Sequence, residues 1–340
     1  MLVSVDKLRR YELGALLQEG KALMGDIRIA KAQHEPTPTN VVVKHLRRAC
    51  ISSRSIARAL NPRHLLIPIN ENPCVEVAVL KHLQAAGGHP AVIRLLDVIE
   101  DDEHLSIVCE FASGGDLFMA TETAMLAGNA AKKAAFMGIS LANNAGCGGI
   151  AENAVKHVTK QLLSATRFLH LQGYAHRDIS LENIFLARPG AWDIKLADFG
   201  LAAPLVDKQW VTREGDVNSR VGKASCAAPE AWSAFELNAY DGRAADAWSI
   251  GVCVLCMLVG TFMWDEPSAS KNRVIAFLAR DEGRIRVLLT SWFPRMTAGA
   301  VDFLDKLLCF VPSQRASLEE AEAHAWLQGG AADACAACII

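Results

Sequence analysis

Three polar side chains between residues 176 and 200 are of the types that phosphoryl transfer requires. Asn183 follows Asp178 by five residues, and Asp198 follows Asn183 by fifteen. One carboxylate can orient a hydroxyl group, while a second carboxylate and a carboxamide supply the hard oxygen ligands that Mg²⁺ prefers. This stretch is therefore the first candidate for a catalytic centre.

The elements that must position these side chains are short. Two apolar runs, Ile184–Leu186 and Ile194–Leu196, lie between Asn183 and Asp198. Apolar runs of this length that end in polar residues predict a small hairpin of buried strands, with the polar groups on one side of a cleft. Residues 154–171 are apolar near helical spacing and predict a long helix that leads into this stretch.

The stretch as a whole resembles the catalytic loop and the metal-binding loop of eukaryotic protein kinases. Residues 176–178 match H-R-D, residues 198–200 match D-F-G, residues 228–230 match A-P-E, and residues 246–251 match D-x-W-S-x-G. The resemblance covers about residues 11–328. The A-P-E segment, and the absence of the loop pattern of tyrosine kinases, favour the serine/threonine type.

The resemblance implies an α+β fold of two lobes, a small β-rich N-lobe and a larger, mainly helical C-lobe. The expected boundaries are residues 1–111 for the N-lobe, 112–328 for the C-lobe and 329–340 for a C-terminal tail. Two stretches exceed the usual family length. One is a basic insertion at about residues 45–74, and the other is an insertion at about residues 120–150 that we expect to be mobile.

The resemblance also implies an ATP site. Residues 41–44 resemble the V-A-I-K strand, and Glu76 stands where the family places the glutamate that holds this lysine. The glycine-rich loop is irregular, because Gln18 replaces its first glycine and two extra residues separate Gly20 from Gly25, which weakens the expected phosphate clamp. By position, the ATP-binding residues are Gly20, Gly25, Ile27, Val42, Lys44, Cys109, Glu110, Ala112, Asp116 and Phe185.

Catalytic roles are carried over from the family by position. Asp178 would orient the substrate hydroxyl, and Lys44, held by Glu76, would hold the ATP phosphates. Asn183 and Asp198 would bind Mg²⁺. The implied cofactors are ATP and Mg²⁺, and the implied partners are protein substrates.

The catalytic centre departs from the family at two positions. Ser180 stands where serine/threonine kinases usually carry a lysine, and Lys223 stands where the family usually has threonine. We expect the Lys223 ammonium to reach Asp178 or the transferring phosphate and to replace the missing cation in catalysis. The alternative is an exposed lysine that contacts substrate or solvent.

Regulation is predicted from Arg177, which precedes the catalytic aspartate. A phosphate that an upstream kinase adds to Thr212 or Ser219 would pair with Arg177 and order the segment between D-F-G and A-P-E. The alternative is that both are unmodified polar residues of a loop.

Specificity is predicted from two acidic residues. Asp116 and Glu182 match family positions that face an arginine before the target hydroxyl, whereas a third acidic position is Cys256 here. The resemblance therefore implies a mild preference for one basic residue in the substrate.

Composition narrows the function classes. Of the 340 residues, 51% are hydrophobic and 21% charged, so the chain can bury a sizeable core, and the net charge of -2 gives no indication of nucleic-acid binding. The best apolar run, residues 248–259, is too short for a bilayer and predicts a buried helix rather than a transmembrane segment. Ten scattered cysteines predict reduced thiols and a cytoplasmic location, with the nucleus as a second compartment.

The main alternative from another class is a pseudokinase, a scaffold that binds nucleotide or partner proteins with little catalysis. The irregular glycine loop and Ser180 favour it, whereas the intact Lys44, Glu76 and Asp178 oppose it. A small-molecule kinase of similar fold is disfavoured by the complete A-P-E segment.

Overall fold

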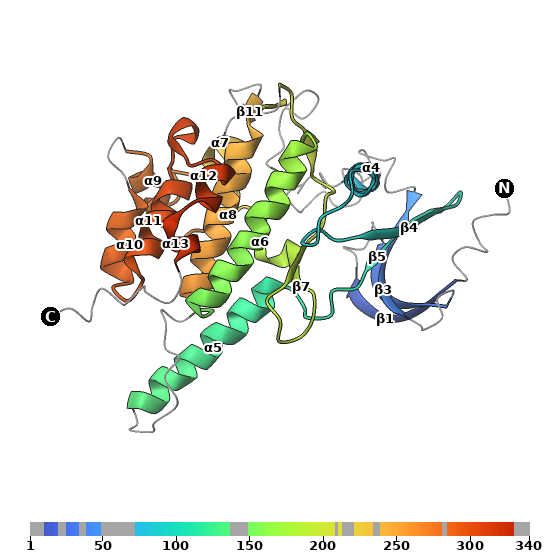
Figure 1. Ribbon diagram of the computed structural model, residues 1–340, viewed down its shortest axis with the longest axis horizontal. Coiled ribbons are helices and arrows are strands. Elements are labelled where there is room, and N and C mark those ends of the chain that lie inside the picture. The colour runs from blue at the N-terminus through green and yellow to red at the C-terminus, as the bar shows by residue number, and fades with distance from the viewer. Residues whose placement is uncertain are drawn as a thin grey trace, which may run out of the picture.

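Strands and helices separate into two lobes along the chain in this computed structural model (Figure 1). The structure describes residues 10–19, 25–33, 39–48, 72–136, 149–207, 210–212, 221–233, 239–280 and 284–329. Among the described residues, the N-lobe holds a five-stranded sheet and one helix, and the C-lobe is mainly helical. The predicted α+β, two-lobed fold is confirmed.

The N-lobe sheet is antiparallel and has the order β1-β2-β3-β5-β4. Its strands are β1 (Tyr11–Glu19), β2 (Gly25–Ala32), β3 (Thr39–Arg47), β4 (Leu95–Glu100) and β5 (His104–Glu110). Because side chains alternate between the faces of a sheet, β3 buries Val41 and Val43 in a small cluster on one face and turns Val42 and Lys44 to the other. The second face is the one available for a ligand between the lobes.

Helix α4 (Pro73–Ala85) packs beside this sheet and carries Glu76 in its first turn. Its start is well specified, since Asn72 caps the backbone N–H of Cys74 and Pro73 occupies the first turn. The helix ends at Ala85. Gly87 and Gly88 follow with φ of 100° and 68°, a backbone that leaves the helix without strain for glycine.

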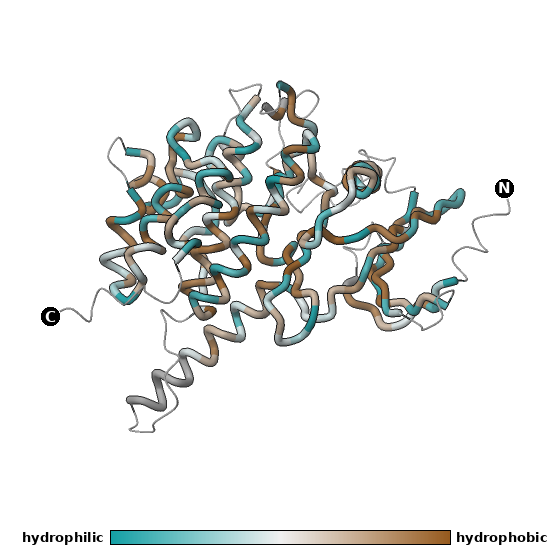
Figure 2. The backbone as a smooth tube through the Cα atoms, viewed as in Figure 1, coloured by the Kyte–Doolittle hydropathy of each residue, from teal (hydrophilic) through white to brown (hydrophobic). Residues whose placement is uncertain are grey.

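The C-lobe is built around helices α6 (Glu152–Leu171) and α8 (Gly242–Val259), which pack against each other. Helix α6 confirms the helix predicted before the catalytic stretch. Hydrophobic stretches run through these helices and the sheet, and hydrophilic ones gather at outer turns (Figure 2). The remaining helices are α7 (Pro229–Ser233), α9 (Arg273–Leu278), α10 (Ile285–Trp292), α11 (Ala298–Leu307), α12 (Leu318–Glu322) and α13 (Ala325–Gln328).

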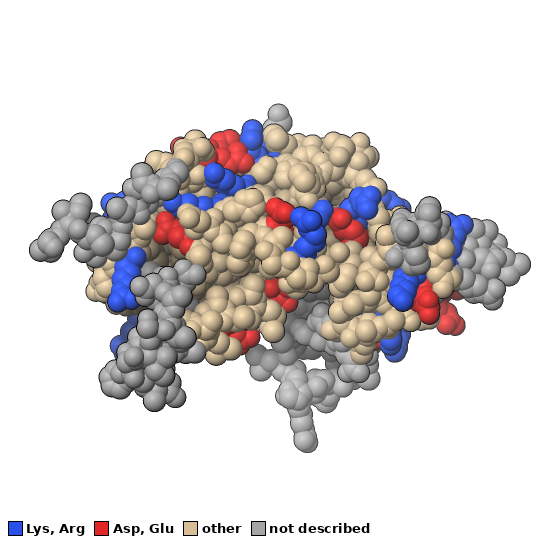
Figure 3. All heavy atoms as spheres, turned by 60° about the horizontal axis from the view of Figure 1, so that its bottom comes forward, with Lys and Arg blue, Asp and Glu red and all other residues tan. Residues whose placement is uncertain are grey.

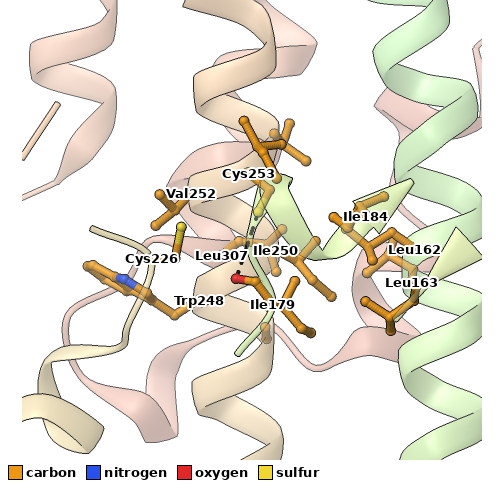
Figure 4. Packing of buried hydrophobic residues seen from close by; sticks show 14 of the residues in the cluster. Leu162, Leu163, Ile179, Ile184, Cys226, Trp248, Ile250, Val252, Cys253 and Leu307 are labelled. Atoms are coloured by element: carbon orange, nitrogen blue, oxygen red, sulfur yellow. Dashed lines mark hydrogen bonds between the residues drawn. The ribbon is translucent and has the colours of Figure 1, made fainter. Parts of the chain in front are cut away.

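Helix α8 is longer than the apolar run that the sequence suggested. Its 18 residues are long and apolar enough to cross a membrane, the only such helix in the described part of the chain. However, 89% of this window is buried inside the protein, as the central helix of a lobe must be. Residues of α8 surround Ile179, and the Cys253 thiol lies 3.9 Å from the Ile179 carbonyl oxygen (Figure 4).

Helix α5 (Leu117–Phe136) takes up the first part of the predicted insertion at about residues 120–150. The alanine-rich sequence continues the helix for 20 residues, since alanine has the highest helix propensity. The helix projects beyond the body of the C-lobe (Figure 1). Residues 137–148 lie outside the described residues, as does most of the basic insertion, including its predicted helix at residues 54–60.

Three short two-stranded pairs lie in the described part of the C-lobe. The predicted hairpin is confirmed as β7 (Ile184–Leu186) paired with β8 (Ile194–Leu196). Strand β6 (Tyr174–Ala175) pairs with β9 (Ala203–Pro204), and β10 (Trp210–Thr212) pairs with β11 (Ala239–Asp241). Two 3-10 turns complete the chain, η1 (Leu181–Asn183) and η2 (Pro312–Gln314).

Charged side chains are mixed on the face shown in Figure 3. Lysine and arginine lie next to aspartate and glutamate there, separated by uncharged surface. This distribution agrees with the net charge of -2 of the whole chain.

Candidate active site

The backbone that leads to Asp178 is held from behind by a buried carboxylate of α8. Asp246 accepts hydrogen bonds from the backbone N–H groups of His176 and Arg177, at 2.8 and 2.9 Å, and contacts His170 Nε2 at 2.8 Å. Burial by itself would raise the pKa of Asp246, but its hydrogen bonds and the nearby histidines hold that pKa below its usual value. The carboxylate therefore stays charged and fixes the loop.

His176 is buried and links the catalytic loop to the metal-binding loop. Its Nε2 lies 3.2 Å from the Ala197 carbonyl oxygen, and its Nδ1 accepts from the Asp178 backbone N–H at 3.3 Å. This pair of contacts requires a neutral ring protonated at Nε2. Burial lowers the pKa of His176, which agrees with that neutral form. Its ring also lies 4.9 Å from the Phe199 ring.

The Asp178 carboxylate is held by two neighbours. Asn183 Nδ2 donates to Oδ2 at 2.7 Å, and the backbone N–H of Lys223 donates to Oδ1 at 2.9 Å. Gly222 makes the second contact possible, because it has a φ of 82° and a Cβ there would lie 2.4 Å from the Arg177 carbonyl oxygen. Gly222 and Lys223 belong to the activation segment, which runs from the D-F-G loop to the A-P-E residues. This segment thus packs closely against the backbone of the catalytic loop.

Lys44 is placed between two carboxylates. Its Nζ lies 2.9 Å from Glu76 Oε2 and 3.7 Å from Asp198 Oδ1. Asp198 has a left-handed φ of 63°, and the N–H of Asn72, at the cap of α4, donates to the Gly200 carbonyl oxygen at 2.8 Å. Strand β3, helix α4 and the D-F-G loop are therefore joined in one arrangement.

Asn183 and Asp198, the predicted metal ligands, lie at the same end of the β7–β8 hairpin, where Ile184 pairs with Leu196 and the Ala197 N–H donates to the Asn183 carbonyl oxygen at 2.9 Å. Asn183 uses its amide nitrogen on Asp178, which leaves its carbonyl oxygen for a cation. In the described part of the chain, no group of three or more His, Cys, Asp or Glu side chains could hold a metal alone. A carboxylate and one amide oxygen fit Mg²⁺, which keeps several waters and binds mainly through substrate phosphates.

The predicted adenine surface lies on the ligand-side face of the sheet. Ile27 pairs with Lys44, and Val42 pairs with Cys109, so these side chains share one face. All four are partly buried rather than fully exposed. Burial raises the pKa of the Cys109 thiol, which is therefore neutral and acts as part of an apolar wall.

Of the two glycines assigned to the phosphate loop, Gly25 is described. It begins β2 with a φ of 122°, and a Cβ there would lie 1.9 Å from the His45 carbonyl oxygen, so the close strand approach requires glycine. Gly20 lies outside the described residues.

The hinge, residues 112–117, connects the two lobes and packs on β7. The Gly114 N–H donates to the Leu186 carbonyl oxygen at 2.9 Å, and Asp116 forms a bridge with Phe185. The Glu110 carboxylate pairs with Lys195, at 2.8 Å, and its backbone N–H donates to the Arg94 carbonyl oxygen at 3.0 Å. Ala112 is partly buried in the same segment.

Asp116 has a structural contact in addition to its predicted place in the ribose site. Its Oδ1 accepts from the Met119 N–H at 2.8 Å, at the start of α5. One carboxylate oxygen therefore caps the helix, and the other is left for a ligand.

The predicted catalytic contact of the Lys223 ammonium is wrong in this structure. The ammonium forms an ion pair with Glu182 and lies 5.1 and 5.3 Å from the ring centres of Phe118 and Phe262. A nearby carboxylate and two aromatic faces attract the cation more strongly than the amide-bound Asp178 does. Lys223 contacts Asp178 through its backbone instead.

Arg177 is engaged by β11. Its Nε donates to the Tyr240 hydroxyl at 2.9 Å, and Tyr240 pairs with Val211, next to Thr212. Thr212 lies at the end of β10 and pairs with Ala239, the neighbour of Tyr240 on β11. Ser219 lies outside the described residues.

The sequence reasoning missed four side chains at this site. His170 supports Asp246, Tyr240 holds Arg177, and Phe118 and Phe262 lie beside Lys223. The position of Phe118, directly after the segment that resembles the hinge, was a usable signal. The other three come from elements whose packing a single sequence does not reveal.

A two-lobed fold that brings a lysine–glutamate pair, an H-R-D loop and a D-F-G loop to one cleft defines the class of protein kinases. The family model for the protein kinase domain matches residues 28–327, and the chain belongs to this family.

The chain is similar to several curated kinases. It is 28% identical to CBL-interacting protein kinase 21 of Oryza sativa subsp. japonica over 95% of this chain and 50% of that protein. It is 27% identical to the serine/threonine-protein kinase kin-29 of Caenorhabditis elegans over 96% of this chain and 32% of that protein. Identity to the serine/threonine-protein kinase CHK1 of Saccharomyces cerevisiae is 31%, over 70% of this chain and 39% of that protein. The chain spans half or less of the length of these three relatives.

Proposed function

We propose that the chain is an active serine/threonine kinase that transfers the γ-phosphate of ATP to hydroxyl groups of protein substrates. The observation that carries the proposal is the contact of Lys44 with Glu76 at 2.9 Å, with Asp198 only 3.7 Å from the same ammonium. The pair places a cation where nucleotide phosphates must lie, beside a carboxylate suited to Mg²⁺. The serine/threonine type is supported by the names of the relatives and by the A-P-E segment.

Each residue of the cleft has a defined part in the proposed transfer. The Asp178 carboxylate, fixed by Asn183 and by the Lys223 backbone, orients the substrate hydroxyl and accepts its proton as the oxygen attacks. Lys44 holds the phosphates in line with that oxygen. Mg²⁺, bound by Asp198 and Asn183, would supply positive charge for the phosphates. The buried Asp246 and His176 keep the loop rigid during this step.

The experiment is Mg²⁺-dependent transfer of labelled phosphate from ATP to a generic basic protein. We expect transfer by the wild type, and a loss of about a hundredfold or more in Asp178→Asn, since the hydroxyl loses its oriented acceptor. Asp193→Asn, in an exposed ion pair of the β7–β8 turn, is the matched control and keeps full activity. Equal rates for the wild type and Asp178→Asn would contradict the proposal.

A pseudokinase is the second candidate, and one observation favours it. Ser180 is buried and the Lys223 ammonium is paired with Glu182, so neither supplies the cation that the family has beside Asp178. A pseudokinase would bind ATP, measured by a shift of melting temperature, without transferring label. The same assay therefore separates the two candidates.

We also propose that an upstream kinase regulates the protein through Thr212 or Ser219. The pairing of β10, which carries Thr212, with β11, whose Tyr240 holds Arg177, supports Thr212 as the site. Mass spectrometry of the protein after incubation with ATP and a cell extract tests for the phosphate. Full activity of both Thr212→Ala and Ser219→Ala would exclude this form of regulation.

A further inference from the structure

A cluster of four side chains lies beside the catalytic aspartate. The Lys223 ammonium forms an ion pair with Glu182 and lies over the rings of Phe118 and Phe262, at 5.1 and 5.3 Å from their centres. The two rings are themselves nearly parallel, with 6.4 Å between centres and 15° between planes. We call these four side chains the lysine–aromatic cluster.

The cluster must border the path of a bound substrate. The backbone N–H of Lys223 touches Asp178 Oδ1 at 2.9 Å, and Glu182 follows Asp178 by four residues on the same loop. A lysine side chain reaches about 6 Å, which two residues of an extended peptide also span at about 3.3 Å each. A substrate that presents its hydroxyl to Asp178 therefore places a residue two or three positions away against the cluster.

The Glu182 carboxylate is closed to a second cation. Its Oε1 is taken by Lys223, and its Oε2 is buried without a hydrogen-bond partner among the residues that the structure describes. A substrate guanidinium needs both oxygens in an open plane for a bidentate contact. It would also have to approach an ammonium that is itself about a third exposed, at 35%.

We propose that Lys223 is a specificity-determining residue that makes this subsite neutral and apolar. The substrates are then proteins whose target serine or threonine has uncharged apolar residues, and no arginine or lysine, two or three positions away. The proposal rests on the proposed kinase function. It replaces the preference for a basic residue that Asp116 and Glu182 implied in the sequence.

The chemistry of the cluster agrees with an apolar occupant. Phe118 and Phe262 are partly exposed, so part of their aromatic surface remains for an apolar side chain to cover. The lysine–glutamate pair has no net charge, so it does not select for a charged side chain there. An additional cation, in contrast, meets Lys223 without a free carboxylate oxygen to compensate.

The test compares two sets of serine peptides that differ only in arginine or leucine at positions within three residues of the serine. The ratio of kcat/KM for arginine over leucine is measured for the wild type, Lys223→Ala, Glu182→Gln and the double variant. Lys306→Ala, in an exposed ion pair with Asp302, is the matched lysine control. Because the ratio is internal to each enzyme, a general loss of activity does not disturb it.

We expect a ratio below one for the wild type. Lys223→Ala uncovers the Glu182 carboxylate and raises the ratio about tenfold, the value of one charge-assisted hydrogen bond. Glu182→Gln leaves the ammonium unpaired and lowers the ratio, the double variant returns it to the wild-type range, and Lys306→Ala leaves it unchanged. A wild-type preference for arginine, or equal ratios for the wild type and Lys223→Ala, would overturn the proposal.

Failure of the kinase function itself gives a different result. In that case no enzyme transfers phosphate to either peptide set, although ATP still binds. The same ratio is then read as relative Kd from fluorescence anisotropy of labelled peptides with a non-hydrolysable ATP analogue. Equal Kd values for both peptides in the wild type and Lys223→Ala would again overturn the assignment of Lys223.

Discussion

Asp198 is the residue on which the nucleotide chemistry depends most directly. It lies 3.7 Å from the Lys44 ammonium and supplies the carboxylate of the proposed Mg²⁺ site. We expect Asp198→Ala to lower phosphoryl transfer by about a hundredfold or more, because the charge on the phosphates is no longer compensated. ATP still binds through the hinge, as a fluorescent nucleotide displaced by ATP will measure. Near-normal turnover of this variant would show that the metal site is wrongly assigned.

Gly222 offers a second prediction at the level of single residues. An alanine there would clash with the Arg177 carbonyl oxygen and move the Lys223 N–H away from Asp178. Gly87→Ala is the matched control, because Gly87 also has a positive φ, 100°, but nothing lies within 4 Å of its Cβ position. Both variants should lose about 1 kcal/mol of stability from backbone strain.

Only Gly222→Ala should lose activity, by about tenfold or more in kcat, since a misplaced carboxylate is costly in the transition state. Steady-state kinetics and urea unfolding of the two variants separate the effects. A similar kcat for both variants would contradict the role given to the Gly222 backbone.

The sequence was sufficient to predict the contacts of residues whose partners follow from the family pattern. Lys44 and Glu76 form the predicted pair, and Asp246 holds the catalytic loop as expected. Lys223 was misjudged because the direction of a flexible side chain depends on its tertiary neighbours. Its partners Glu182, Phe118 and Phe262 come from three separate elements, and no local pattern brings them together.

At the level of elements, the activation segment is anchored to the far side of the C-lobe by one ion pair. Arg315 donates to both oxygens of Glu230, at 2.6 and 3.1 Å, and to the Ala244 carbonyl oxygen at 2.6 Å. Its guanidinium also lies 5.1 Å from the ring centre of Trp248. The arginine side chain is fully buried, so these contacts, rather than water, stabilise its positive charge.

We expect Glu230→Gln to lower the free energy of unfolding by about 3 kcal/mol or more, because it leaves a buried guanidinium without its counter-ion. Asp193→Asn breaks an exposed pair with Arg188 and should change stability by less than about 1 kcal/mol. Urea unfolding monitored by tryptophan fluorescence measures both. Equal destabilisation in the two variants would show that burial of the pair does not matter.

Elements were predicted unevenly, for physical reasons. The β7–β8 hairpin and helix α6 have strong apolar patterns and were predicted correctly. The length of α5 was missed, because an alanine-rich stretch has a high helix propensity but little amphipathic pattern.

At the scale of the whole molecule, we expect the free energy of unfolding to depend on pH, because His176 is buried. Burial holds its pKa below the unfolded value of 6.5, so the unfolded chain takes up the proton first as the pH falls. The stability that the neutral ring provides is complete above pH 6.5 and declines as the pH falls towards the folded pKa. His45 and His89, whose pKa values are also lowered by burial, act in the same direction.

We therefore expect the free energy of unfolding to decrease as the pH falls from about 6.5 to about 5.5. His176→Phe keeps an aromatic ring in place and should flatten this slope, whereas His157→Phe, at an exposed position of α6, should not. Urea unfolding at several pH values gives the slopes. The same slope for the wild type and His176→Phe would exclude His176 as a source of the effect.

The hydrogen bond between the Asn72 N–H and the Gly200 carbonyl oxygen, at 2.8 Å, has a thermodynamic consequence. It makes the beginning of α4 and the D-F-G loop a single cooperative unit, because neither can shift without breaking the bond. A ligand that holds α4 in place therefore changes the free energy of moving the D-F-G loop, and the reverse also holds. Suppose that a molecule binds α4 and increases the affinity for nucleotide by a given factor. By linkage, bound nucleotide then increases the affinity for that molecule by the same factor.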